Sequence, residues 1–254
     1  MKKYFVVIAL FSFIFISAKS FSNNIYEITV YHFKDAQQEI TLDTYLQTAY
    51  LPALHRQQKK IGVFKPIAND TATDKLIYVI VAYTSFDEIQ ALQAALTIDA
   101  TYNEAGKAYL TASYQNPPYT RTEKIILKAF ATSPTMNLPK LTGDKKDHVY
   151  ELRSYESPTE NYHLNKVKMF NSGEINIFSK LNFNAVFYAD VIVGSHMPNL
   201  MYLTCFENMA DHDAHWKSFG DNEDTKKMFG LDEYKNNVSK ADIILMHAAT
   251  YSDY

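Results

Sequence analysis

The sequence predicts an α+β fold in which one βαββαβ unit occurs twice, because three segments recur in the same order along the chain. IYEITVYHF, from Ile25, shares Tyr-Glu and a later Tyr with VYELRSYE, which begins 124 residues later at Val149. The same spacing aligns Tyr78 of KLIYVIVAY with Tyr202 of NLMYLTCFE. IILKAFAT, from Ile125, recurs as IILMHAAT at a slightly shorter spacing. Ordered repeats of this kind indicate duplication.

Each copy contains the segments of four strands and two helices. Alternating runs rich in β-branched and aromatic residues predict the strands. Apolar stripes at helical spacing, capped by Thr41 and Ser85 in the first copy, predict the helices. The first copy has expected strands at 25–33, 63–68, 76–83 and 124–131 and helices at 42–60 and from 85 onwards. The second has expected strands at 149–156, 183–193, 200–206 and 242–249 and helices at 160–181 and 209–219.

This order of elements is that of a ferredoxin-like domain. Such a domain covers one face of its sheet with both helices and leaves the other face to be buried elsewhere. Two tandem ferredoxin-like domains, at 23–132 and 148–254, are therefore expected to form an internal pseudodimeric α+β barrel. Residues 133–147 between them contain Pro, Gly and a run of charges, which is typical of a linker.

Residues 1–22 have the features of a secretory signal peptide. Lys2 and Lys3 precede an apolar run that ends at Ile16, and small residues follow. Because this run is shorter than the roughly 20 residues of a membrane-spanning helix, we expect cleavage and no stable membrane anchor afterwards. The predicted location is periplasmic or secreted. The single Cys205 cannot form an internal disulfide, so the core alone must hold the fold together.

Composition narrows the classes of partner. A net charge of −3 without a basic block argues against a nucleic-acid partner. The chain contains neither a phosphate-binding loop nor a dinucleotide motif, so no cofactor is predicted. Tyr and Phe number 19 and 16, enough to supply a large aromatic core. The sequence leaves open whether the chain is a monomer or pairs into a homodimer.

VYELRSYE, an apolar strand about 30 residues later and the run from MYLTCFE to the Trp of HDAHW together resemble the NIPSNAP family. The resemblance covers the second copy almost end to end. It is weaker in the first copy, where Thr29 stands in place of Arg153 and Leu92 in place of Trp216. The resemblance implies the dimeric α+β barrel fold, and it supplies no set of catalytic residues that could be transferred to this chain.

Alternation along the first strand of each copy separates a polar face from a more apolar one. Glu151, Arg153 and Tyr155 share one face, and Glu27 and Tyr31 hold the matching positions in the first copy. The apolar set is expected to meet the helices, which leaves the polar set to face the other sheet. There it could hold an acidic or aromatic molecule, or Glu151 or Glu27 could form a structural ion pair with Arg153.

Histidines supply weaker candidates. His247 lies near the end of a predicted strand and could approach the mouth of the barrel beside the polar face. His212 and His215, three residues apart near Asp211, could share a helix face, but a surface helix explains them equally well and no metal site is predicted.

Two classes of function remain. The favoured class is a non-enzymatic module that binds a small apolar or aromatic molecule or another protein, because no catalytic motif is present. The alternative is an enzyme. Dimeric α+β barrels also house cofactor-independent monooxygenases, haem-degrading enzymes and small lyases, although shared fold alone does not establish function.

Overall fold

The computed structural model describes residues 24–254, so the predicted signal peptide lies outside the described part. The first half contains β1 (Ile25–Phe33), α1 (Ala36–Tyr45), α2 (Leu51–Arg56), β2 (Ile61–Pro66), β3 (Lys75–Tyr83), α3 (Phe86–Ile98), α4 (Ala100–Ala105), α5 (Lys107–Leu110) and β4 (Arg121–Ala129). The second half contains β5 (Val149–Glu156), α6 (Glu160–Met169), α7 (Ile175–Lys180), β6 (Asn184–Val193), β7 (Asn199–Phe206), α8 (Met209–Asp221), α9 (Glu223–Phe229) and β8 (Lys240–Ala248).

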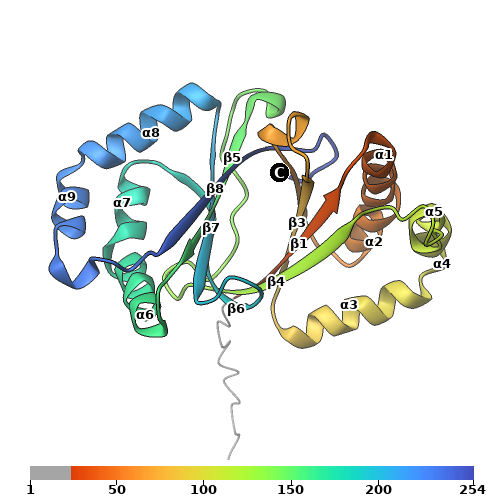
Figure 1. Ribbon diagram of the computed structural model, residues 1–254, viewed down its shortest axis with the longest axis horizontal. Coiled ribbons are helices and arrows are strands. Elements are labelled where there is room, and N and C mark those ends of the chain that lie inside the picture. The colour runs from red at the N-terminus through yellow and green to blue at the C-terminus, as the bar shows by residue number, and fades with distance from the viewer. Residues whose placement is uncertain (1–23) are drawn as a thin grey trace, which may run out of the picture.

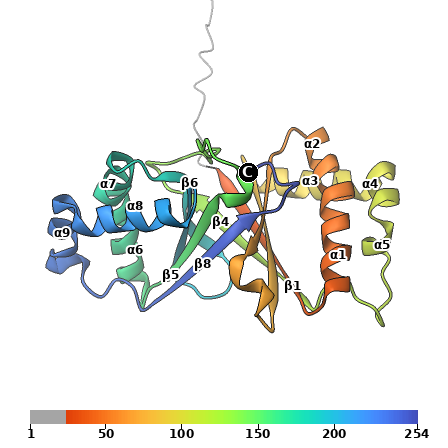
Figure 2. The same cartoon turned by 90° about the horizontal axis from the view of Figure 1, so that it is seen from above.

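The eight strands form one closed antiparallel barrel. Their order around it is β1-β3-β2-β8-β5-β7-β6-β4. Each half contributes a four-stranded ferredoxin-like sheet, and the two sheets join through β2 with β8 and through β4 with β6. The helices of each half cover the outside of its own sheet, so the barrel lies between two helical layers (Figures 1 and 2). This arrangement confirms the predicted pseudodimeric α+β barrel.

Aromatic and aliphatic side chains from both sheets fill the interior of the barrel. Tyr26 packs against Phe187 and Phe64 against Tyr150, with ring centroids 5.2 and 4.8 Å apart. All four side chains are at most 1% exposed. Each of these pairs joins one half of the chain to the other, so the interior acts as a shared core and holds the two sheets together.

The duplication extends to an irregularity in the helices. A π-helical turn, Leu46–Tyr50, joins α1 to α2, and a second, Phe170–Glu174, joins α6 to α7 at the same 124-residue spacing. The first helix begins six residues before its predicted start, because Asp35 and not Thr41 caps it by accepting a hydrogen bond from the Gln38 N–H at 2.9 Å. Shared π-helical turns are consistent with a single ancestral unit, and such turns frequently mark functional sites.

The repeat spacing shortens in the third strand. The ladders pair Ile28 with Ile80 and Leu152 with Leu203, so β3 and β7 correspond at a spacing of 123 residues. The predicted equivalence of Tyr78 and Tyr202 is therefore wrong by one position. Because side chains alternate along a strand, this single step places Tyr78 inside the barrel and Tyr202 on the helix-covered side.

Among residues 24–254, no helix has the length and apolar character needed to cross a membrane.

Candidate functional site

The polar face of β5 lies under the helices, which is opposite to the predicted orientation. Tyr150 and Leu152 point into the barrel, whereas Tyr155 packs with the core beneath the C-terminal helices. Glu151 accepts a hydrogen bond from the indole of Trp216, on α8, at 2.6 Å. The enclosed interior takes the more apolar set, because the helical layer can supply hydrogen-bond partners that the interior cannot.

The matching face of β1 also lies under helices and forms no joint site with β5. Glu27 is buried and accepts from Lys124 at 2.6 Å, so the predicted alternative pairing of Glu27 with Arg153 does not occur. Thr29, which stands where β5 has Arg153, makes a long hydrogen bond of 3.4 Å to Glu27. Tyr31 packs against Tyr109 in the helix-side core of the first half. The polar faces of the two halves are thus separate, and they differ in chemistry.

The histidines have local partners. The Nδ1 of His247 lies 2.8 Å from the carbonyl oxygen of His148, next to the start of β5. His212 Nε2 lies 3.5 Å from the Glu151 carboxylate, and His215 Nδ1 lies 2.8 Å from a backbone oxygen one helical turn earlier. Within the described part of the chain, no group of three or more His, Cys, Asp or Glu residues is placed to hold a metal ion.

Glu151, Arg153 and Tyr155 do come together, in a network around the buried Glu151 carboxylate that also includes the partly buried Trp216. Arg153 donates from Nε to Glu151 Oε1 at 2.8 Å, and its Nη2 lies 2.7 Å from the same oxygen. Its guanidinium stacks 3.6 Å from the centre of the Trp216 ring, and Nη1 donates to the Tyr155 hydroxyl at 3.0 Å. The predicted structural ion pair is therefore present, and a cation–π contact and an indole hydrogen bond fix its geometry.

The network continues into the helical layer. The hydroxyls of Tyr155 and Tyr202 lie 2.9 Å apart, and burial raises the pKa of Tyr202 well above its ordinary value. Beside them, Lys166 donates to Glu174 at 2.8 Å, and both side chains are buried. Burial raises the pKa of Glu174, although the Lys166 ammonium opposes this shift. Two ion pairs thus lie beneath the C-terminal helices. In each, a carboxylate that is at most 2% exposed needs its cationic partner to remain charged.

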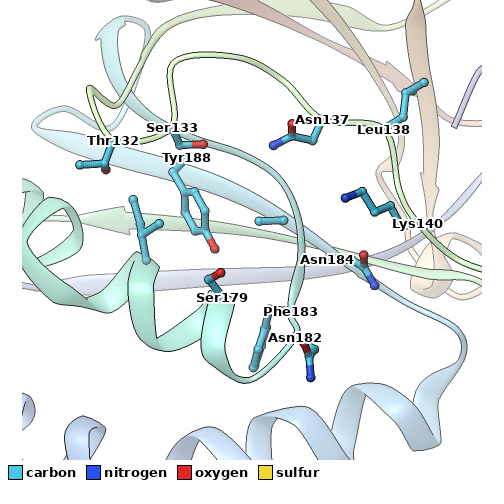
Figure 3. Close-up of a pocket in the computed structure, with 12 residues that line it drawn as sticks. Thr132, Ser133, Asn137, Leu138, Lys140, Ser179, Asn182, Phe183, Asn184 and Tyr188 are labelled. Atoms are coloured by element: carbon cyan, nitrogen blue, oxygen red, sulfur yellow. The ribbon is translucent and has the colours of Figure 1, made fainter.

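A groove of about 480 Å³ opens beside this network, between the segment 132–140, the end of α7 and the start of β6 (Figure 3). Its base is aromatic, because Phe183 and Tyr188 line it and are only 7% and 3% exposed. Its rim carries side-chain hydrogen-bonding groups from Asn137, Lys140, Ser179, Asn182 and Asn184. An aromatic base with a few convergent polar groups is the usual composition of a small-molecule site.

The aromatic base of the groove packs directly against the network of Glu151, Arg153, Tyr155 and Trp216. Phe183 packs edge-to-face on Trp216, with ring centroids 5.1 Å apart. Tyr188 stacks on Tyr202 at 5.7 Å and an interplanar angle of 30°. The network therefore fixes the two aromatic rings at the base of the groove from behind, in the way that outer residues hold a preorganised site.

Comparison with known proteins identifies this half of the molecule. Residues 150–252 match the model of the NIPSNAP family. The C-terminal half is a NIPSNAP domain. Among curated proteins, none matches the sequence of the chain.

Solved structures of other proteins resemble the whole chain and not only its C-terminal half. A proposed monooxygenase from Lactobacillus acidophilus is 10% identical and superposes with a TM-score of 0.59, covering 91% of this chain and 97% of that chain. One from Fusobacterium nucleatum is 7% identical with a TM-score of 0.59, covering 89% and 93%. At these identities the likeness shows a common two-domain barrel fold.

Sequence reasoning missed the groove of the NIPSNAP domain. The sequence predicts only a strand for Phe183 and Tyr188, and the predicted domain boundary divides the segment 132–140 between the first domain and the linker. The one available signal was the pair Asn182 and Asn184 around an aromatic residue, and asparagines before a strand are equally typical of a turn. Asn182 does adopt such a conformation, with φ of 59°.

Proposed function

We propose that the NIPSNAP domain binds a small aromatic molecule in the groove between α7, β6 and the segment 132–140. The observation that carries this proposal is the composition of the groove, in which the rings of Phe183 and Tyr188 lie below a rim of amides, hydroxyls and one ammonium. A planar ring can lie against the exposed edges of these two rings, while the rim fixes its orientation through hydrogen bonds.

The volume and rigidity of the groove support this role. About 480 Å³ is within the usual range for sites that hold a small ligand. Because Trp216 and Tyr202 hold the two basal rings, little side-chain ordering would accompany binding, which favours affinity. In an exported protein, as the N-terminal sequence predicts, such a site would sample aromatic molecules outside the cytoplasm.

Trp216 makes the proposal directly testable, because it is the only tryptophan and it contacts Phe183. Titration of the full chain with 2-naphthol and 4-hydroxyphenylacetate should change Trp216 emission in a saturable way, and calorimetry should give the same dissociation constant for at least one of them. Thr132→Tyr should abolish the response by filling the groove, whereas Thr135→Tyr, at an exposed position outside the lining, should not. Saturable binding that survives Thr132→Tyr would refute the groove as the site.

A cofactor-independent monooxygenase is the second candidate. The hydroxyl of Tyr188 points toward Ser179 across the groove (Figure 3), where it could donate a hydrogen bond to a phenolic substrate during reaction with dioxygen. The shared barrel of two proposed monooxygenases permits this chemistry without establishing it. Oxygen consumption that depends on 2-naphthol and falls in Tyr188→Phe would favour the enzyme, and its absence with a bound phenol would leave the binding role.

A further inference from the structure

Because the chain is duplicated, the place in the first half that corresponds to the groove can be located residue by residue and compared with it. The ladders pair Ile28 with Ile125 and Leu152 with Ile244, so the segment that follows β8 corresponds to the segment that follows β4. The predicted alignment of IILKAFAT with IILMHAAT, which places Ile125 on Ile243, is therefore wrong by one position. The backbone confirms the correspondence of the two segments. The Ser133 N–H donates to the oxygen three residues earlier at 3.0 Å, and a Ser252 N–H does the same at 2.8 Å.

In the first half, two side chains of the C-terminal segment occupy this place. Asp253 accepts from the backbone N–H of Ile61 at 2.7 Å, and one of its oxygens lies 2.9 Å from His55 Nε2. Tyr251 lays its ring against the helix-side core, and its hydroxyl donates to Asp43 at 2.6 Å. The first half therefore fills the place with one aromatic ring and one carboxylate.

The second half has small side chains at the corresponding positions, which is why its groove is open. Thr132 stands where the first half has Tyr251, Pro134 where it has Asp253, and Ser179 where it has His55, by the same pairing of the two halves. The strand that borders this place is present in both halves. Ala185 and Tyr188 of β6 line the groove, and β2 packs beside Tyr251 in the first half. What the second half lacks, relative to the first, is a ring and an acid.

We propose that the ligand of the groove is a small aromatic carboxylate, which supplies the ring and the acidic group that Tyr251 and Asp253 supply in the first half. This inference rests on the proposed binding function and names its ligand class. The donors of the rim suit an anion, because Ser179 and Asn182 offer hydrogen bonds and Lys140 offers a positive charge. No carboxylate pairs with Lys140 within residues 24–254, so its ammonium is available to a ligand.

Comparison of 4-hydroxyphenylacetate with 4-hydroxyphenylacetamide tests the proposal, because the two differ in charge and share a ring. Calorimetry with the full chain should show the acid binding at least about tenfold more tightly, which corresponds to about 1.4 kcal/mol, since hydrogen bonds to a charged group are stronger than those to a neutral amide. Lys140→Gln should reduce this preference to near equality, whereas Lys145→Gln, an exposed lysine of the same connecting segment outside the groove, should leave it unchanged.

The outcomes separate this inference from the proposed function. Equal binding of acid and amide, both lost in Thr132→Tyr, would retain the aromatic groove and overturn the carboxylate class. A preference for the acid that persists in Lys140→Gln would overturn the assignment of Lys140 as its counter-ion. If neither molecule nor 2-naphthol binds, the proposed function and this inference both fail.

Discussion

Removal of the Arg153 side chain should destabilise the NIPSNAP domain strongly, because it would leave the carboxylate of Glu151 charged and 1% exposed. Arg153 is the cationic partner of that carboxylate on the same strand, and contacts it through Nε at 2.8 Å and Nη2 at 2.7 Å. Removing one member of a buried ion pair costs about 3–5 kcal/mol. Since the Arg153 side chain is 15% exposed, some water can reach the vacated space, and we expect about 3 kcal/mol for Arg153→Met.

Urea unfolding followed by far-ultraviolet circular dichroism measures this loss. The double variant Glu151→Gln with Arg153→Met should return to within about 1 kcal/mol of the parent, because a neutral amide can still accept from Trp216 and no charge is left unpaired. Lys124→Met provides a control in the other half. Lys124 is 50% exposed and Glu27 only 4%, so water can take the place of the ammonium beside the buried carboxylate, and Lys124→Met should cost less than Arg153→Met.

The double variant decides between two explanations for Arg153. If it is as unstable as Arg153→Met alone, the guanidinium stabilises the domain through its stacking on Trp216, and the argument from an uncompensated carboxylate is refuted.

Three further predictions concern other parts of the second half. Lys166→Met should lower the free energy of unfolding in urea titrations by about 3 kcal/mol, because it leaves the Glu174 carboxylate, which is 2% exposed, without its cationic partner. Adding Glu174→Leu should restore most of this stability, and a double variant no more stable than Lys166→Met would contradict the explanation. Hydrogen bonds from two linker N–H groups hold the pKa of Glu207 below its ordinary value, so the unfolded chain takes up its proton first as pH falls. These hydrogen bonds should therefore be present at neutral pH and lost as pH falls through that lowered pKa. Protection of the linker amides, measured as the exchange rate relative to the intrinsic rate at each pH, should then fall in acid for the parent and stay unchanged in Glu207→Gln. An identical loss of protection in both would exclude this role of Glu207. Asn208→Ala should cost about 1 kcal/mol in thermal unfolding, because its side chain accepts from the Asp211 N–H at 3.0 Å as the cap of α8, and an unchanged midpoint would show that the cap is dispensable.

The strands and the duplication could be predicted because both produce recognisable patterns in short segments of the sequence. The alternation in IYEITVYHF and VYELRSYE fixes which side chains share a face. It does not reveal which face turns inward, since both contain large aromatic residues: Tyr26 and Tyr150 lie inside the barrel, and Tyr31 and Tyr155 lie outside it. The deciding factor was the closure of eight strands, which is a property of the whole fold.

The candidate site was harder to predict than the fold for a related reason. Glu151 and Arg153 stand out in the sequence because charges on a strand are unusual, and with Trp216 they support the wall behind the groove. The groove itself results from residues that are small, such as Thr132 and Ser179, beside a base supplied by a different element. A space between side chains has no sequence pattern of its own, and the comparison with Tyr251 in the first half shows only which groups this space lacks.

The closed strand order has a consequence for biosynthesis. When the first half leaves the ribosome, β2 and β4 both border an open sheet, because their outer neighbours β8 and β6 belong to the part of the chain still to be made. The last of these, β8, is also the last strand within residues 24–254. An open edge invites pairing with other chains, so the nascent first half should depend on chaperones or remain unfolded until β8 has been made. Truncation before Lys240 should accordingly give aggregates instead of a stable single domain.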